Sequence, residues 1–284
     1  MSNSTFDLSE PVITRDEILV VKDKYFNPEN VAIVTGAASG IGRATAVALA
    51  VNGLTTIVSD RNVEGGKKTV EIAENLGGKV IFVAANLAKD DEIEDCVKEA
   101  ARHGKIKYLA NIAGMQHIDS VENFPMEIYD LMQRVMLRAP FYLSKLCIPH
   151  MRASEDGVGV IGNMCSVHAH IVTKNKPVYN ITKFGLRGLT QSIAAEGEGK
   201  IRSFSVSAGT TKTPLSTGQI PAVARQRGIS EEEVVRTISL GTSRIKEMMM
   251  PVEVANLFVV GFSRLGKFLI GGDLLFDGGR VKTY

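Results

Sequence analysis

Short apolar runs rich in β-branched residues alternate along this chain with longer helical patterns, and this alternation constrains the fold more than any other feature. Seven such runs occur, at residues 31–36, 55–60, 80–87, 108–114, 158–166, 201–209 and 268–279. Several are apolar on both faces, which is typical of parallel strands that are covered by helices on each side. We therefore predict an α/β fold, a doubly wound parallel sheet of about seven strands with helices on both faces.

The organisation of the chain indicates one large domain. No internal repeat and no Pro-, Gly- or Ser-rich linker divides the 284 residues, so we assign residues 31–284 to a single domain. Residues 1–30 form an N-terminal extension, whose apolar residues 18–21 pack either on the domain or on a neighbouring subunit. Residues 210–250 contain the helical pattern GISEEEVVRTI, which predicts a helical flap over the carboxyl edge of the sheet.

Composition and charge exclude several classes of protein. The 33 basic residues nearly balance the 31 acidic ones and form no dense basic stripe, so nucleic acid is not an expected partner. The three cysteines include no CxxC pair, which argues against a disulfide framework or a zinc site. No apolar run reaches the ~18 residues that cross a membrane, and the N-terminus lacks the pattern of a secretory signal. We expect a cytoplasmic protein without membrane contact.

A glycine-rich turn follows the first predicted strand and precedes a helical pattern. It contains Gly36, Ser39, Gly40, Ile41 and Gly42. Glycines let a pyrophosphate approach the backbone, and the helix N-terminus offers that anion N–H groups and a positive dipole. The spacing is GxxxGxG rather than GxGxxG, and the strand and helix around it are what favour a nucleotide site over a simple turn.

Asp60 ends the second predicted strand, where a carboxylate accepts hydrogen bonds from the hydroxyls of an adenosine ribose. The same carboxylate would repel a 2′-phosphate, although Arg61 beside it partly offsets that repulsion. Taken alone, Asp60 is also an ordinary residue for a turn after a strand. In the context of the glycine-rich turn, it favours NAD over NADP as the cofactor.

Tyr179 and Lys183 are four residues apart in a helical pattern that begins near Pro177, so they lie on one face of the helix. A phenol is a poor base at neutral pH unless a nearby cation favours the phenolate, and Lys183 can supply that charge. A lysine four residues after a tyrosine is common, so the pair alone indicates only an exposed helix face. Ser166 ends the fifth predicted strand, where its hydroxyl can hold a carbonyl or alkoxide oxygen.

These residues together resemble the short-chain dehydrogenase/reductase family over about residues 30–279, through TGAASGIG, Asp60, NIAG at 111–114, Ser166, Tyr179 and Lys183. The resemblance implies a single-domain Rossmann fold that moves a hydride between a nicotinamide and an alcohol or ketone carbon. It implies Tyr179 as the general base, Lys183 as the cation that assists it and holds the nicotinamide ribose, and Ser166 as the group that orients the substrate oxygen. Further cofactor contacts are implied for Asn86, Leu87, Asn111, Ala113, Gly114, Thr211 and Thr213. A homotetramer, built through the central long helices and the C-terminal segment, is also implied.

Two positions depart from the pattern of that family. Its members usually have an Asn in the long central helix, which completes a proton relay, and the matching residue here is Met136. Met136 continues an apolar stripe at helical spacing, formed by Ile128, Leu131, Met132 and Val135. The stripe predicts that the thioether packs in the core. The family's Pro-Gly after the sixth strand is Ala208-Gly209.

Within the family, residues 113–117, 165–170, 176 and 213–220 resemble the (R)-3-hydroxybutyrate dehydrogenases. That resemblance implies a site for a small carboxylate, formed by Gln116, His168, Lys176 and Gln219, within a substrate site that also includes Ser166 and Tyr179. Lys176 would supply charge and the other side chains hydrogen bonds. The chain contains no Trp, whereas the hydroxybutyrate enzymes place tryptophan around the substrate, and Thr210 follows Gly209. We therefore expect a wider or wetter pocket than theirs.

The sequence thus predicts an NAD-dependent oxidoreductase that interconverts a small 3-hydroxy acid and its 3-oxo acid. Another short-chain alcohol dehydrogenase or a 3-oxoacyl reductase is the main alternative, and Lys176 separates the two because neutral substrates need no cation. A non-catalytic nucleotide-binding protein is a second alternative, supported only by Met136. The motif His168-x-His170 is typical of metal ligands, but no third ligand accompanies it, so no metal site is predicted.

Overall fold

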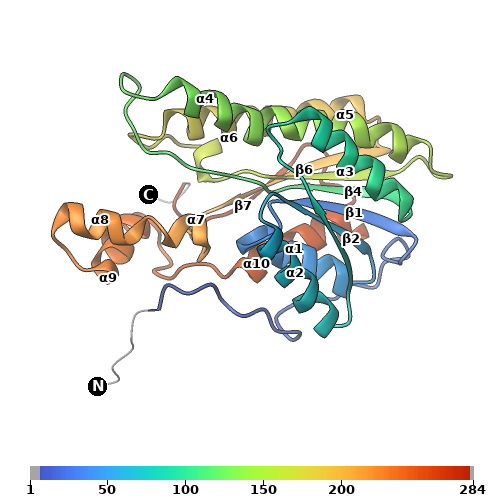
Figure 1. Cartoon of the computed structure of the whole chain (residues 1–284), viewed down its shortest axis with the longest axis horizontal. Helices are drawn as coiled ribbons and strands as arrows, with labels where there is room; N and C mark the ends of the chain where they lie inside the picture. Colours follow the sequence, from blue (N-terminus) through green and yellow to red (C-terminus); the bar gives the residue numbers. More distant parts are fainter. Residues whose placement is uncertain (1–6, 282–284) are drawn as a thin grey trace.

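Seven parallel strands form the centre of the molecule in a computed structural model, which describes residues 7–281. Their order across the sheet is β3-β2-β1-β4-β5-β6-β7 (Figure 1). The strands are β1 (Asn30–Thr35), β2 (Thr55–Asp60), β3 (Lys79–Ala84), β4 (Lys105–Asn111), β5 (Gly159–Met164), β6 (Ile201–Ala208) and β7 (Asp273–Phe276). The doubly wound parallel sheet that the alternating runs predict is therefore confirmed.

Helices cover both faces of this sheet in two layers (Figure 1). One layer contains α1 (Gly40–Val51), α2 (Val63–Asn75) and α10 (Pro251–Phe262). The other contains α3 (Asp90–Arg102), α4 (Met126–Gln133), α5 (Ala139–Arg152) and α6 (Pro177–Glu196). A π-helical turn, η1 (Arg134–Arg138), joins α4 directly to α5, so the predicted long central helix is continuous. No helix within residues 7–281 is long and apolar enough to cross a membrane.

Strand β1 shows how the sequence builds this layered core. Its side chains alternate between the two faces of the sheet. Ala32 and Val34 belong to the apolar cluster that includes α1 and α10, whereas Val31 and Ile33 belong to the cluster that includes α3 and α5. β2 and β3 follow β1 on one side of the sheet, whereas β4 and the later strands lie on its other side, so the strand order reverses at β1. A crevice opens at the carboxyl ends of the strands at such a reversal.

The N-terminal segment, residues 7–29, contains neither strand nor helix and runs beside the layer of α1 and α10 (Figure 1). The backbone N–H of Leu19 donates to Asn256 Oδ1 of α10 at 2.9 Å, and that of Val21 donates to Asn52 Oδ1 at 2.8 Å. Ile18 is buried in the same core cluster as α1. The apolar patch at residues 18–21 is therefore attached to the body of the chain itself through Ile18.

Short helical pieces follow β6 in the region predicted to form a flap. They are α7 (Pro214–Thr217), α8 (Ile220–Arg227), α9 (Glu231–Val234) and the π-helical η3 (Val235–Ser239). Ile220, Val234 and Leu240 form a small apolar cluster that holds these pieces together. In Figure 1 they project to one side of the molecule.

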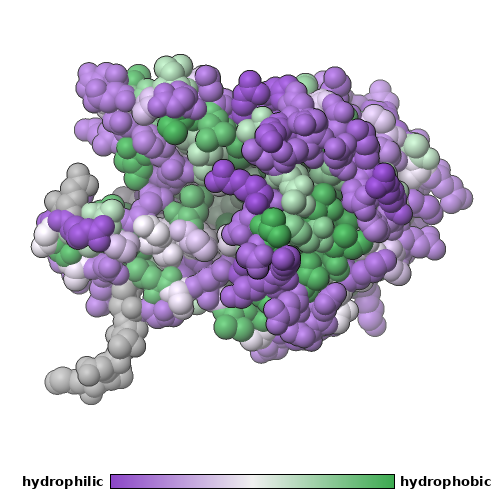
Figure 2. All heavy atoms as spheres, viewed as in Figure 1, coloured by the Kyte–Doolittle hydropathy of each residue, from purple (hydrophilic) through white to green (hydrophobic). Residues whose placement is uncertain are grey.

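The last strand is shorter than the apolar run at residues 268–279 predicts. Gly271 and Gly278 have φ angles of 74° and 61°, in the left-handed region, so extended structure is confined to the residues between them. Phe268 and Ile270 lie before the strand and are exposed. Over the rest of the surface seen in Figure 2, hydrophilic residues predominate and separate smaller apolar areas.

Candidate active site

The glycine-rich turn joins β1 to α1 and lines a cavity of about 320 Å³, here called the central cavity. Gly36 has a φ angle of +65°, and a Cβ atom there would lie 2.6 Å from Ala113 Cα. A Cβ atom on Gly42 would lie 2.1 Å from the carbonyl oxygen of Gly36. Both positions therefore require glycine, and the resulting close packing brings the N-terminus of α1 to the cavity. Ser39, Gly40 and Ile41 line the cavity as well.

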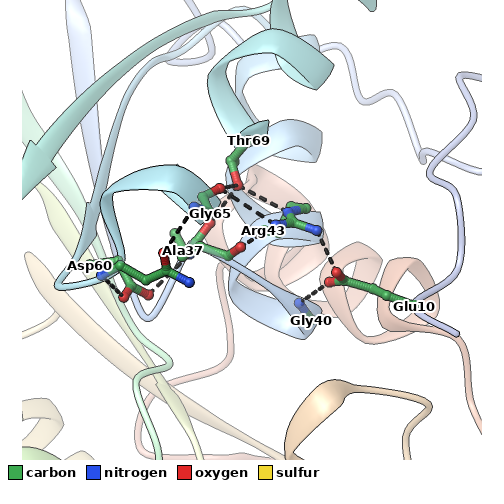
Figure 3. A network of polar contacts seen from close by, with 9 residues as sticks. Glu10, Ala37, Gly40, Arg43, Asp60, Gly65 and Thr69 are labelled. Atoms are coloured by element: carbon green, nitrogen blue, oxygen red, sulfur yellow. Dashed lines mark hydrogen bonds and ion pairs between the residues drawn. The ribbon is translucent and has the colours of Figure 1, made fainter. Parts of the chain in front are cut away.

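A buried arginine supports this turn from behind (Figure 3). Arg43 donates hydrogen bonds to the carbonyl oxygen of Ala38 and, at 3.1 Å, to Thr69 Oγ1. It also forms an ion pair with Glu10 of the N-terminal segment at 2.5 Å. The other carboxylate oxygen of Glu10 accepts the backbone N–H of Gly40 at 2.5 Å. The N-terminal segment is thus part of the structure around the turn, which no sequence pattern indicated.

Asp60 lies at the end of β2, between the central cavity and a small cavity of about 110 Å³. Its carboxylate oxygens accept the backbone N–H groups of Ala38 at 3.1 Å and Asn62 at 2.9 Å (Figure 3). These two hydrogen bonds hold the carboxylate at the carboxyl edge of the sheet. The small cavity is also lined by six other residues predicted to contact a cofactor: Gly36, Arg61, Asn86, Leu87, Ala113 and Gly114.

Thr35, at the end of β1, fixes the chain that follows β4. Its Oγ1 accepts the backbone N–H groups of Ile112 at 3.0 Å and Ala113 at 3.2 Å, which is feasible because β1 and β4 are neighbours in the sheet. Asn111 differs from the other predicted cofactor contacts. Its side chain is buried and donates through Nδ2 to Asn163 Oδ1 at 2.9 Å, so it lies in the sheet rather than in a cavity wall.

Ser166, Tyr179 and Lys183 come together at the central cavity, the first from the chain after β5 and the other two from α6. Lys183 is buried, and its Nζ donates to the carbonyl oxygen of Met164 at 2.7 Å. The same Nζ lies 5.4 Å from the centre of the Tyr179 ring. The ammonium therefore places a positive charge beside the phenol in a poorly hydrated environment, where charges interact more strongly than in water. Thr211 and Thr213 line the same cavity.

His168 lies beside these residues in the short 3₁₀ turn η2 (Val167–Ala169). Its Nδ1 is hydrogen-bonded to Ser166 Oγ at 3.1 Å and its Nε2 to Thr173 Oγ1 at 2.9 Å. The ring also packs edge-on against Tyr179, with 5.4 Å between the ring centres. His168 therefore fixes the position of the Ser166 hydroxyl.

The pKa of His168 is lowered to about 4, chiefly by burial and further by nearby positive charges, those of Lys176, Arg280 and Lys183. A histidine with this pKa is neutral at pH 7. Its contribution to the site at that pH is therefore hydrogen bonding rather than charge.

A third cavity, of about 570 Å³ and here called the outer cavity, extends from Ser166 and Tyr179 to α8 and η3. The residues predicted to hold a carboxylate all line it: Gln116, His168, Lys176 and Gln219. Gln219 Nε2 donates to Gln116 Oε1 at 3.4 Å, which links the start of α8 to the chain after β4. Arg280, four residues after β7, lines the same cavity and was missed by the sequence analysis.

Met136 lies in the π-helical turn η1 and is buried against Met132 and Val178, as the apolar stripe predicts. The backbone N–H of Met115 donates to its Sδ at 3.3 Å. A sulfur atom therefore satisfies this N–H weakly at the position where the family has an amide. A π-helical turn inside a long helix is frequent near functional sites.

His168 and His170 do not share a site. His170 Nε2 is hydrogen-bonded to Asp273 Oδ2 at 2.8 Å, away from the partners of His168. Within residues 7–281, no group of three His, Cys, Asp or Glu side chains is placed to hold a metal ion. Cys96, Cys147 and Cys165 are free thiols buried in the core.

Comparison with known proteins identifies this arrangement. The sequence profile of the short chain dehydrogenases matches residues 30–223, more than half of the chain. The chain belongs to the short-chain dehydrogenase/reductase family. It is accordingly an oxidoreductase that acts on CH–OH groups, and members of the family use NAD or NADP.

Relatives in this family differ in the substrates for which they are named. The chain is 33% identical over 252 residues to a D-beta-hydroxybutyrate dehydrogenase of Rhizobium meliloti, covering 87% of this chain and 97% of the relative. It is 32% identical over 262 residues to a cyclohexanol dehydrogenase of an Acinetobacter species, covering 91% and 97%. The crystal structure of L-sorbose reductase from Gluconobacter frateurii with NADPH and L-sorbose resembles it with a TM-score of 0.84 at 25% identity, covering 92% and 100%.

Proposed function

We propose that this protein oxidises a small 3-hydroxy acid, of which 3-hydroxybutyrate is the reference, to the 3-oxo acid with NAD, and catalyses the reverse reaction. One observation carries the proposal: Lys176 lines the same cavity as Ser166 and Tyr179, and no carboxylate is among the lining residues described. Burial lowers the pKa of Lys176, so holding its charge there is costly without an anion. A substrate carboxylate would pair with the ammonium, whereas a neutral alcohol would not.

The chain's own residues supply the proton chemistry of this reaction. Tyr179, as the phenolate that Lys183 stabilises, takes the proton of the substrate hydroxyl and becomes the neutral phenol, and Lys183 also binds the nicotinamide ribose. Ser166, oriented by neutral His168, donates a hydrogen bond to the substrate oxygen. NAD, when bound, accepts the hydride that leaves the carbinol carbon. One proton and one hydride have then left the alcohol, which becomes a ketone.

The residues around the central cavity fit NAD. The turn has no Cβ atom at Gly36, Gly40 or Gly42, which leaves the backbone open to a pyrophosphate. The Asp60 carboxylate is held where it would accept hydrogen bonds from a ribose and repel a 2′-phosphate. Arg43 behind the turn is neutralised by Glu10, so it offers no free charge to such a phosphate. We expect Asp60→Ser to weaken NAD binding and to narrow its preference over NADP; an unchanged ratio of the two Kd values would contradict this assignment.

The activity is tested by mixing the protein with NAD and (R)-3-hydroxybutyrate and recording NADH absorbance. We expect turnover in the wild type and a loss of at least about 100-fold in kcat for Tyr179→Phe, with NAD affinity unchanged. Tyr142→Phe is the matched control. Tyr142, on α5, donates a hydrogen bond to Glu94 of α3 and lines neither cavity of the site, so this variant should leave kcat unchanged. NADH formation with cyclohexanol but with no hydroxy acid would overturn the proposal.

A neutral-alcohol dehydrogenase is the second candidate. The volume of the outer cavity favours it, because about 570 Å³ is more than a four-carbon acid fills. The Acinetobacter relative is named for a neutral cyclic alcohol. A non-catalytic nucleotide-binding protein, suggested by Met136, is disfavoured because Ser166, Tyr179 and Lys183 line one cavity.

We also propose a homotetramer, in line with the family resemblance. Large apolar side chains are exposed on α5 and α6, with Phe141 57%, Ile181 49% and Phe184 43% accessible, and Phe268 is exposed before β7. Exposed apolar surface on adjacent helices is a common sign of an interface. Light scattering should give four times the chain mass, and the double variant Phe141→Ser, Phe184→Ser should lower it. A monomer mass for the wild type would refute the assignment.

A further inference from the structure

Of the four cations that line the outer cavity, Lys174 and Arg227 are exposed, and the partly buried ones are Lys176 and Arg280. They come from distant parts of the chain, just before α6 and just after β7. The positive charge of Arg280 lowers the pKa of both Lys176 and His168, in addition to the larger effect of burial. The two charges are therefore close enough to repel one another, although one ammonium would suffice for one carboxylate.

Two donors from residues that line this cavity are buried without a hydrogen-bond partner in the described part of the chain. Arg280 donates through NH1 to the carbonyl oxygen of Ser239 at 3.2 Å, but its Nε is buried and has no hydrogen-bond partner within residues 7–281. Gln116 Nε2 is likewise buried and unpartnered in the described part of the chain. Buried donors are nearly always paired in folded proteins, so these atoms indicate the place of a ligand rich in acceptors.

The position of Arg280 is fixed by the chain around it. Asp277 lies just after β7, and its carboxylate accepts the backbone N–H of Gly279 at 2.9 Å and of Val281 at 2.7 Å. Both carboxylate oxygens are thus used to hold the turn that carries Arg280, and Asp277 does not line the outer cavity. The guanidinium is therefore held at the cavity, where burial lowers the pKa of Arg280 and the Asp277 charge opposes that effect only in part.

We propose that the substrate carries a second anionic group, which Arg280 binds while Lys176 binds the carboxylate next to the reacting carbon chain. The class that fits is a 3-hydroxy dicarboxylic acid, whose second carboxylate supplies the acceptors that Arg280 Nε and Gln116 Nε2 lack. Such a molecule also fills more of the 570 Å³ cavity than a four-carbon monoacid. The inference rests on the proposed function, because it assigns the substrate of the same site.

The test compares two substrates that differ only in the distal group, 3-hydroxypentanedioate and 3-hydroxypentanoate, each with NAD. We expect the diacid to have a kcat/KM about ten- to a hundred-fold higher, the effect of one charge-assisted hydrogen-bonded pair. Equal or better use of the monoacid would overturn the inference while leaving the proposed function intact. Oxidation of neither acid, with NADH formed from cyclohexanol, would instead overturn the proposed function.

Variants separate the roles of the two cations. Arg280→Met should remove the preference for the diacid, with less than about a threefold change for the monoacid, whereas Arg280→Lys should retain part of it. Lys176→Met should impair both acids. Arg225→Met, at an exposed position on α8 that does not line the cavity, is the matched control and should change neither.

A binding measurement covers the case in which Arg280→Met alters folding. Pentanedioate and pentanoate, which cannot be oxidised at C3, are titrated calorimetrically into wild-type protein saturated with NADH. Tighter binding of the diacid by about tenfold or more supports the inference. Equal affinities would overturn it, whatever the behaviour of the variant.

Discussion

Replacing Glu10 tests whether the N-terminal segment stabilises the glycine-rich turn. The Glu10 carboxylate joins two elements that are distant in sequence, the N–H of Gly40 at the start of α1 and the guanidinium of Arg43, both at 2.5 Å. The Glu10 side chain is 24% exposed and that of Arg43 only 7%. Glu10→Ala removes both hydrogen bonds and leaves the buried guanidinium without its anion.

The size of the effect follows from these contacts. A hydrogen bond to a charged group contributes about 1.5–3 kcal/mol, and breaking a fully buried ion pair costs about 3–5 kcal/mol. Arg43 keeps the Ala38 carbonyl and Thr69 as acceptors, and Glu10 is partly hydrated, which reduces the loss. We expect Glu10→Ala to lower the free energy of unfolding by about 2–4 kcal/mol. Glu10→Gln retains an acceptor for Gly40 and should cost about half of that.

Thermal and urea denaturation measure this loss. For a chain of this size about 2 °C is lost per kcal/mol, so Glu10→Ala should lower Tm by about 4–8 °C. Glu64→Ala is the matched control, because Glu64 pairs with Lys67 on the exposed surface of α2 and such pairs contribute little. If Glu10→Ala and Glu64→Ala melt at the same temperature, the reasoning is refuted.

Three further predictions concern the turn, His168 and Met136. Gly42→Ala places a Cβ atom 2.1 Å from the Gly36 carbonyl oxygen, so the turn would have to move away from the central cavity. NAD affinity measured by titration should therefore fall at least tenfold, and an unchanged affinity would contradict the close packing. The pKa of His168 is about 4 in the folded protein and about 6.5 in the unfolded chain, so wild-type stability should fall as the pH drops from 6.5 to 4. In urea titrations over this range, the wild type should lose up to about 3 kcal/mol more than His168→Gln does. Parallel curves of stability against pH for the two proteins would argue against this. Met136→Asn puts an amide among Met132 and Val178, so Tm should fall without a gain in kcat, and a higher kcat with a shifted pH profile would show that the family's relay had been restored.

The fold was predictable because its information is local and repeated. A parallel strand that is buried on both faces is apolar along most of its length, as β1 is over residues 31–34, and this leaves a run that the sequence alone reveals. The strand at residues 268–279 was predicted too long because glycine is compatible with both an extended and a left-handed backbone. Only the tertiary structure decides that Gly271 and Gly278 take the latter.

The candidate site was predictable where topology brings residues together. Ser166 follows β5 and the glycine-rich turn follows β1, so both reach the carboxyl edge of one parallel sheet. Glu10 could not be found in this way, because it lies neither at a strand end nor in a periodic pattern. Arg280 directly follows the last predicted strand, but it belongs to no motif that would single it out. Their roles come from single long-range contacts, with Gly40 in one case and with the outer cavity in the other.

The glycine-rich turn and the outer cavity differ in how their positive charges are balanced, and this difference affects which cofactor and which substrate the site selects. Among the residues described, Arg43 is the only buried cation that contacts the glycine-rich turn, and Glu10 neutralises its charge. Binding of a pyrophosphate at the turn therefore depends on backbone N–H groups and the helix dipole. At the outer cavity Lys176 and Arg280 are partly buried and no lining residue is acidic, so an anion there meets an excess of positive charge. Glu10 and Arg280 both lie outside residues 30–223, the part that matches the family profile. The matched part thus contains the groups that move the proton, while the flanking segments modify the charge that cofactor and substrate encounter.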